Sequence, residues 1–255
     1  MKCLGKLTVF IFLLATSNQI AIGQVASPFE LINIIAPQNA PPKGLTSNYN
    51  NKKLPSGYEK EALAALAYFP ELKNVSVKFK VKKSFATLKT RPTLLSMFMP
   101  KGHRRYVITI SNHTIAKLNP VILKNLPEAA RIGIIGHELS HVVDFSRKST
   151  WQSFKVAFGH LSKTYMDSLE YNTDKICIQH GLGKNLEAWS SYIRNTMHTT
   201  YWRGADFVDK GDTHYERYMN PATIEKYLTE NIPLKNPPTA IARLPIKSGA
   251  GNFAK

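Results

Sequence analysis

Residues 133–144 carry two histidines and a glutamate at a spacing that suits metal chemistry. Each residue of a helix turns by about 100°, so His137 and His141 point the same way one turn apart, and both can donate a ring nitrogen to one zinc ion. Glu138 lies beside them, displaced around the helix, where it can contact a water molecule on the metal without being a ligand. This arrangement predicts zinc-dependent hydrolysis with Glu138 as the general base.

The same spacing also arises by chance. In a chain with 8 histidines, a His-Glu-x-x-His pattern is expected in roughly one sequence in a hundred, so an ordinary helix with two histidines stays open on the pattern alone. Two glycines in the same helix argue against it. Gly133 and Gly136 each cost a helix interior about 1 kcal/mol relative to alanine, which indicates that another part of the chain approaches this helix closely.

A hydrolytic zinc site needs a third protein ligand and leaves one position open for water. One large class of zinc peptidases takes a histidine six residues after the second, with a glycine between, but Asp144 and Arg147 occupy those positions and exclude that class. A glutamate on a downstream helix is the other common source, and Glu170 is the candidate. Asp174 follows one turn later on the same face, where it can accept a hydrogen bond from the second nitrogen of a ligand histidine.

Glu170 also has a purely structural interpretation. Asp167 and Glu170 have the spacing of a capping box, in which Glu170 would only tie off a helix N-terminus. Cys177 lies on the same side as Glu170, but seven residues of helix place it roughly 10 Å along the axis, too far to share the ion. We expect Cys177 to be a buried, unreactive thiol.

These residues resemble the gluzincin metallopeptidases, most closely the small soluble relatives of the Ste24 and HtpX type. The resemblance rests on His137-Glu-x-x-His141 followed by Glu170-x-x-x-Asp174, and on the helix sequence EAARIGIIGHELSHVVD. It covers residues 128–181, roughly a fifth of the chain. Thr173 stands where that group usually has alanine, and the transmembrane helices of its membrane-bound members are missing. The resemblance implies a zincin-like α+β fold, in which a small twisted mixed sheet with an edge strand packs on the motif helix and a mostly helical C-terminal half follows.

Hydrophobic periodicity predicts the elements that must position these residues. Residues 58–70 have helical spacing up to Pro70. Apolar residues alternate with Ser and Lys over 75–82, which is typical of a half-buried strand with a lysine-lined outer face. Residues 105–111 are a second β-rich run, and 93–99 a candidate third strand between them.

Helical signals dominate from Pro127 onward. A helix is expected from Pro127 to about residue 145, because proline suits a first turn. A second helical region spans 150–180, with Gly181 as its C-cap and Asp167 as the place where it could break. Residues 186–197 suggest a third helix. Asn220 and Pro221 form the N-cap and first position of a last helix that ends near residue 231.

The N-terminus resembles a secretory signal peptide. Lys2 and Lys6 precede the apolar run 7–15, and small residues at Ala21 and Gly23 allow cleavage before Gln24. A membrane anchor is the alternative, but the run has about half of the ~18 apolar residues that a spanning helix needs. We therefore expect a secreted or periplasmic protein. Cys3 would leave with the signal peptide, so Cys177 would be the only thiol and no internal disulfide could form.

The expected domain organisation has four parts. The signal peptide takes residues 1–23. Residues 24–56, rich in proline, asparagine and lysine, read as an extended arm, linker or pro-segment. The zinc metallopeptidase domain spans residues 57–232, and the tail 233–255, rich in Pro, Lys, Gly and Ala, is expected to be loose.

The chain has 34 Lys and Arg against 17 Asp and Glu, a formal net charge of +17. Lys78, Lys80 and Lys82 on one strand face could bind an anionic surface. The alternatives are a solvated face or lysines that keep an edge strand from pairing with other chains. No nucleic-acid motif accompanies the charge, so no specific nucleic-acid partner is expected.

The leading hypothesis is an exported zinc endopeptidase that acts on peptides or proteins, with one Zn²⁺ held by His137, His141 and Glu170. An exported zinc-containing binding protein without turnover, and a non-peptidase hydrolase with the same metal centre, are the alternatives. The residue that stabilises the oxyanion stays open among several candidates in a polar segment, which include His214, Tyr215 and Tyr218.

Overall fold

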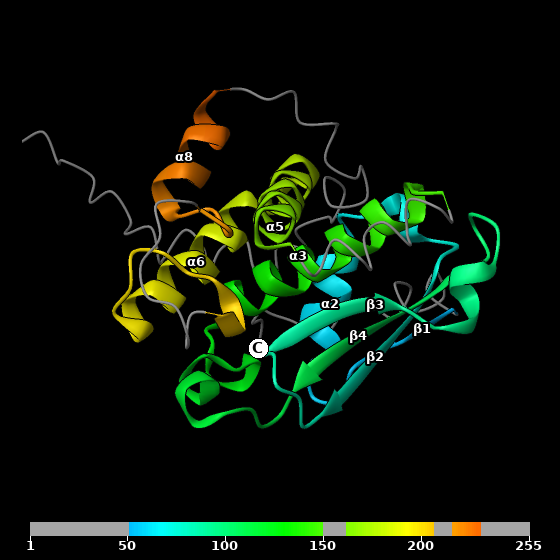
Figure 1. Cartoon of the computed structure of the whole chain (residues 1–255), viewed down its shortest axis with the longest axis horizontal. Helices are drawn as coiled ribbons and strands as arrows, with labels where there is room; N and C mark the ends of the chain where they lie inside the picture. The colour runs from blue at the N-terminus through cyan, green and yellow to red at the C-terminus, as the bar shows by residue number, and fades with distance from the viewer. Residues whose placement is uncertain (1–50, 150–161, 207–215, 231–255) are drawn as a thin grey trace, which may run out of the picture.

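The computed structural model describes residues 51–149, 162–206 and 216–230. The chain has a mixed α and β architecture, in which one small mixed sheet is followed by a mostly helical C-terminal half (Figure 1). This confirms the expected α+β class. The signal peptide, most of the N-terminal arm and the C-terminal tail lie outside the described residues.

Four strands form the sheet, in the spatial order β1 (Lys52–Lys53), β2 (Ser76–Lys82), β4 (Arg105–Ser111) and β3 (Leu88–Pro92). The first three run parallel, and β3 pairs antiparallel with β4. β3 is therefore an edge strand among the described residues. It is also the strand that lies nearest the centre of α3 (Glu128–Arg147), since Thr90 Oγ1 donates to the carbonyl oxygen of Glu138 at 3.2 Å.

The strands β2 and β4 agree with the sequence prediction. Val77 and Phe79 of β2 are buried, and its three lysines, Lys78, Lys80 and Lys82, are exposed on the other face. β4 is buried along nearly its whole length because β2 and β3 flank it on both sides.

The strand predicted at residues 93–99 is wrong. Residues Leu95–Phe98 form a 3₁₀ turn, and the third strand lies earlier, at Leu88–Pro92. The Ser96 hydroxyl contacts the carbonyl oxygens of Thr93 and Arg105, each at 3.0 Å, and these side-chain bonds close the turn. The strand β3 has mostly polar and charged residues and no apolar alternation, so periodicity does not reveal it.

The end of the expected N-terminal arm joins the sheet. Lys52 and Lys53 pair in parallel with Val77 and Lys78 of β2. The Lys52 ammonium donates to the carbonyl oxygens of Leu72 and Val75 at 2.8 and 2.6 Å, so a single side chain binds the end of the arm to the turn before β2.

The helix α3 is the central element of the fold. It lies between the sheet and α2 (Glu59–Leu66) on one side and the helices α5 (Lys163–Cys177) and α6 (Gly183–Met197) on the other (Figure 1). This position explains why α3 is buried nearly all round, with Leu139, Val142 and Val143 fully buried. The last helix, α8 (Pro221–Thr229), packs on α6.

The helix boundaries follow the predicted signals with two differences. Asn220 Oδ1 accepts the backbone N–H of Thr223 at 2.8 Å, which confirms the predicted N-cap of α8. Gly181 has the positive φ of 90° expected of a C-cap, but one wide turn, Ile178–Leu182, leads directly into α6, which begins at Gly183. Asp167 lies inside α5 and does not break it, and its carboxylate pairs with two arginines, Arg203 and Arg217.

None of the helices in the described residues is both long enough and apolar enough to cross a membrane.

Candidate metal centre

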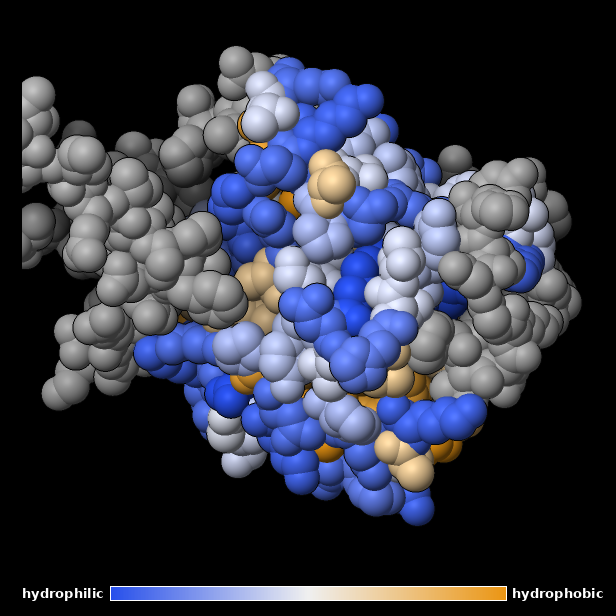
Figure 2. Space-filling view, turned by 90° about the vertical axis from the view of Figure 1, so that its left-hand side faces the viewer, coloured by the Kyte–Doolittle hydropathy of each residue, from blue (hydrophilic) through white to orange (hydrophobic). Residues whose placement is uncertain are grey.

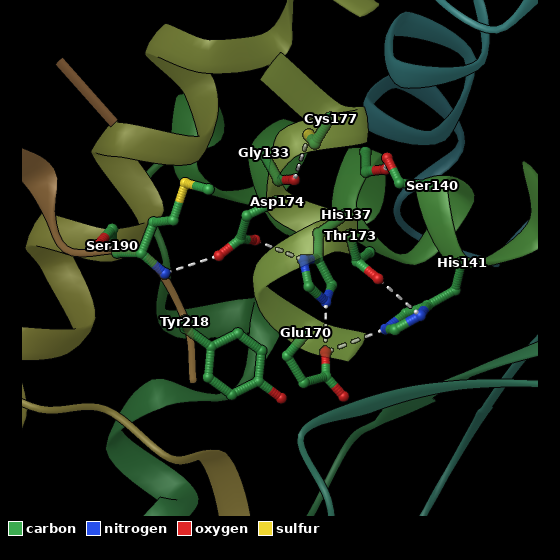
Figure 3. A network of polar contacts seen from close by, with 12 residues as sticks. Gly133, His137, Ser140, His141, Glu170, Thr173, Asp174, Cys177, Ser190 and Tyr218 are labelled. Atoms are coloured by element: carbon green, nitrogen blue, oxygen red, sulfur yellow. Dashed lines mark hydrogen bonds and ion pairs between the residues drawn. The ribbon is translucent and has the colours of Figure 1, made fainter. Parts of the chain in front are cut away.

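The two histidines of α3 point together toward one acidic side chain of α5. Nε2 of His137 and Nε2 of His141 each lie 3.1 Å from Oε2 of Glu170 (Figure 3). The two imidazole rings stand at 90° to each other with centroids 4.8 Å apart. The structure thus brings together all three residues that the sequence proposed as metal ligands.

These three residues can hold a metal ion. Each brings one ligand atom, the three atoms lie within 4.8 Å of one another, and all three side chains are buried. The capping-box interpretation of Glu170 does not apply, because Glu170 lies well inside α5, whose N-cap is Ser162 with its hydroxyl accepting the Tyr165 N–H.

Residues of α5 also determine which ring nitrogen is protonated in each of the two histidines. Nδ1–H of His137 donates to the Asp174 carboxylate at 2.7 Å, as the spacing of Glu170 and Asp174 predicts. Thr173 Oγ1 donates to the Leu169 carbonyl at 2.8 Å and lies 3.2 Å from Nδ1 of His141, so its lone pair accepts the Nδ1–H. We assign both tautomers from this hydrogen-bond network.

With these tautomers, the lone pairs of the two Nε2 atoms face the lone pairs of the Glu170 carboxylate. The two Nε2 atoms and the Glu170 oxygen are then all acceptors, and acceptors 3.1 Å apart repel unless a cation or protons lie between them. Two imidazole nitrogens and one carboxylate oxygen are a donor set that a divalent transition metal accepts. The chain therefore fits a metal ion at this place.

The electrostatics of the site favour positive charge. Burial lowers the pKa of His137, but the hydrogen bonds and charges of Asp174 and Glu170 outweigh burial and raise the pKa to about 10. Burial raises the pKa of Glu170, but the charge of His141 and the 3.1 Å contacts with both imidazoles hold it well below its usual value. A buried metal ion would be stabilised by the same carboxylates.

Glu138 is buried beside this cluster. Its Oε2 atom is inaccessible to solvent and has no hydrogen-bond partner in the part of the chain that the structure describes. Burial raises the pKa of this carboxyl group, and the nearby histidines oppose that effect without reversing it. An unpaired buried carboxylate oxygen costs free energy unless something binds it, so this atom marks a position for a water molecule or substrate group.

Tyr218 completes the surroundings of His137. The ring centroids of these two residues are 5.6 Å apart, and Trp189 lies 5.6 Å from the Tyr218 ring. Figure 3 shows the Tyr218 side chain beside Glu170. Burial raises the pKa of Tyr218 well above its usual value, so its hydroxyl stays protonated and can donate a hydrogen bond. Of the three oxyanion candidates named from the sequence, His214 and Tyr215 lie outside the described residues.

The two glycines of α3 lie where another part of the chain approaches the helix closely, as predicted. A Cβ atom at Gly133 would lie 2.1 Å from the backbone oxygen of Asn185, and one at Gly136 would lie 2.4 Å from Leu182 Cδ1. The start of α6 therefore packs directly on the α3 backbone, one turn before His137. The same close packing buries the thiol of Cys177 and raises its pKa far above the usual value, as expected for an unreactive cysteine.

Three contacts of the site were not foreseen from the sequence. They are the bond from His141 to Thr173, the bond from the Met219 N–H to Asp174 Oδ2 at 2.8 Å, and the bond from Thr90 to the backbone of Glu138. The polar residue at 173, one turn before Cys177 on a buried helix face, is the only sequence signal among them.

Comparison of the chain with family models, with curated proteins and with solved structures found no match. The assignment of a function therefore depends on the geometry of the site.

Proposed function

We propose that this protein is an exported zinc-dependent metallopeptidase of the gluzincin type with a zincin-like fold. The observation that carries the proposal is the convergence of His137, His141 and Glu170 around one position, with the unpaired carboxylate oxygen of Glu138 beside it. A structural metal site would be closed by a fourth protein ligand, and the described residues provide three.

Zinc is the metal that this donor set suits best, since two histidines and a glutamate are a common ligand set of hydrolytic zinc sites. Bound zinc supplies a Lewis acid that polarises a peptide carbonyl and acidifies a water molecule. Asp174 and Thr173 hold the imidazoles of His137 and His141 in the tautomers that leave both Nε2 atoms free. Such outer partners commonly raise metal affinity.

Glu138 is the proposed general base. Its buried carboxylate accepts the proton of the attacking water and passes it to the leaving amine. The raised pKa of Glu138 brings its proton affinity nearer to neutral pH, which suits both transfers. The protonated hydroxyl of Tyr218, beside Glu170, is the proposed donor to the developing oxyanion.

The edge strand β3 is the proposed platform for an extended peptide. In the described part of the chain β3 pairs on one side only, with β4, so its other side can pair with a substrate strand. Thr90 of this strand bonds to the backbone of Glu138, which places the strand next to the proposed base. A substrate bound in this way would present its backbone to the metal.

Export is a separate element of the proposal. It rests on Lys2, Lys6 and the short apolar run that precedes Gly23. We expect the exported protein to begin near Gln24, and intact-mass analysis checks this. A mass that retains residues 1–23 would favour a membrane anchor.

The experiment that tests the activity combines metal analysis of the purified protein with digestion of a broad peptide library. We expect about one zinc per chain and cleavage of internal peptide bonds that stops after chelation. Bound zinc without cleavage of any peptide would favour a zinc-containing binding protein. Cleavage of ester or other non-peptide substrates alone would favour a hydrolase of another class.

A further inference from the structure

The turn that follows β3 exposes its large apolar side chains and buries its polar one. Leu94 and Leu95 are 73% and 83% exposed, while the polar residue next to them, Ser96, is 1% exposed. Phe98 and Met99 of the same turn are also exposed. Large apolar residues that gather at the surface, with the polar residue turned inward, mark a site that contacts an apolar environment.

Hydrogen bonds hold this turn in shape. The Thr93 N–H donates to the Arg105 carbonyl at 2.8 Å, and the Ser96 hydroxyl contacts the same carbonyl at 3.0 Å. The buried guanidinium of Arg104 donates to the carbonyl oxygens of Met99 and Lys148 at 3.2 and 2.9 Å, which ties the turn to the end of α3. The outward direction of the leucines is therefore built into the fold.

The part of the chain that carries the turn has only basic charged residues. No aspartate or glutamate occurs between Glu71 and Glu128, a stretch that includes the turn and three of the four strands. Exposed basic residues flank the turn in sequence and line the outer face of the sheet, where the strand register brings their positions together: Arg91, Lys101, Arg105, Lys53, Lys78, Lys80 and Lys89.

The view onto the left-hand side of Figure 1 shows mainly hydrophilic residues among those drawn in colour, with apolar residues only in small separate patches (Figure 2). The turn lies at the right-hand end of the sheet (Figure 1). The exposed leucines thus lie at the end of the sheet where Arg91 and Arg105 are, and the basic face extends from there along the strands.

We propose that residues 94–99 insert into the headgroup region of a lipid bilayer that contains anionic lipids, with the basic face of the sheet against the phosphates. A short apolar segment and a basic patch are each weak anchors, and together they give stable peripheral binding. A nucleic acid or an acidic glycan would use the basic groups and leave Leu94 and Leu95 in water. This inference concerns a different surface from the metal centre and does not depend on the proposed function.

Vesicle sedimentation of the full chain tests the proposal. We expect binding to vesicles of phosphatidylcholine mixed with phosphatidylglycerol, and much weaker binding to phosphatidylcholine alone. Leu94→Ser with Leu95→Ser should lower the partition coefficient by roughly tenfold or more, because two exposed apolar side chains are lost. The matched control is Phe85→Ser, since Phe85 is exposed but lies at the other end of β3, and it should bind like the wild type.

The basic groups are tested in the same assay. Arg91→Gln with Lys101→Gln should weaken binding to the anionic vesicles and reduce its salt dependence. Lys226→Gln on α8 is the matched control and should change neither. Loss of binding in the arginine and lysine variant together with full binding in the leucine variant would show a polyanion site and overturn the insertion.

A fluorescent probe separates the turn from the apolar N-terminus of the chain. In a Cys3→Ser background, an environment-sensitive dye on Leu95→Cys should shift to the blue when anionic vesicles are added, and the same dye on Phe85→Cys should not. The buried thiol of Cys177 should stay unlabelled. Equal behaviour of the two labelled positions, or equal vesicle binding of all the variants, would contradict the proposal.

Discussion

Asp174 and His137 are joined by a buried hydrogen bond of 2.7 Å between a carboxylate oxygen and Nδ1. The other carboxylate oxygen of Asp174 accepts the backbone N–H of Met219 at 2.8 Å (Figure 3). One side chain therefore fixes the tautomer of a candidate ligand and holds the segment that carries Tyr218. The proposed hydrogen-bond donor to the oxyanion and the candidate ligand are therefore positioned by the same group.

Asp174→Asn should weaken metal binding by about 10- to 100-fold. The amide of asparagine has only one acceptor atom, so either the His137 N–H or the Met219 N–H loses its partner. Competition with a chromogenic chelator measures the affinity. Asp167→Asn is the control, because Asp167 lies on the same helix and binds only arginines among the described contacts. Equal affinities in the Asp174 variant and the wild type would exclude this role.

Thr173→Val should lower the metal affinity by about tenfold, whereas Thr173→Ser should leave it nearly unchanged. Valine has the shape of threonine but no hydroxyl, so the Nδ1–H of His141 would be buried without an acceptor. Serine keeps the acceptor and loses only a methyl group. The same chelator competition gives both affinities, and a valine variant that binds as tightly as the serine variant would show that the contact does not orient His141.

Gly133→Ala should destabilise the fold by about 3 kcal/mol or more, and Gly136→Ala by clearly less. The added methyl at 133 meets the backbone oxygen of Asn185, which cannot move without shifting α6. At 136 the closest atom is the end of the Leu182 side chain, which can rotate away. Urea unfolding compares the two variants, and the reverse order of stabilities would contradict this packing.

The candidate ligands could be selected from the sequence because helical periodicity and the usual ligand types of hydrolytic zinc sites single them out. His137 and His141 share a face of one helix, and Glu170 and Asp174 share a face of another, so two short motifs fix four side chains. The glycine at 133 was likewise informative, since its cost in a helix interior indicates a close contact. These signals are local in the sequence.

The remaining features depend on long-range packing. Tyr218 is far from α3 in the sequence and is brought to His137 by the bond between Met219 and Asp174. The turn at 95–98 has the composition of a strand, and the bonds of the Ser96 hydroxyl to the carbonyls of Thr93 and Arg105 close it instead. Periodicity carries no information on such contacts.

The lowered pKa of Glu71 leads us to expect that the free energy of unfolding depends on pH. Burial raises the pKa of this carboxyl group, but the hydrogen bond from His180 at 2.8 Å and the charge of Arg147 outweigh burial and lower it below 4.5. A lowered pKa in the folded state means that the stabilisation is present above pH 4.5 and is lost as the pH falls through the folded pKa.

Glu71→Gln should therefore reduce the free energy of unfolding near neutral pH and have no effect in strong acid. The loss should stay below about 1 kcal/mol, because the pair is partly exposed and screened by solvent. Glu230→Gln, which removes only an exposed pair with Lys226, is the control. A difference between wild type and variant that persists at low pH would contradict the linkage.

The central claim is that Glu138 acts as the general base at a metal site that it does not help to hold. Glu138→Gln tests it most directly, because glutamine has nearly the size of glutamate and position 138 is not a ligand. Glu128→Gln, on the same helix but paired with Lys60 at the surface, is the matched control.

The measurement is zinc content together with the rate of hydrolysis of a quenched fluorescent peptide. We predict that Glu138→Gln keeps the zinc and the fold and hydrolyses the peptide ~10²–10⁴-fold more slowly than the wild type. Glu128→Gln should keep both the zinc and the activity. Hydrolysis that is unchanged in Glu138→Gln, with zinc still bound, would contradict the account.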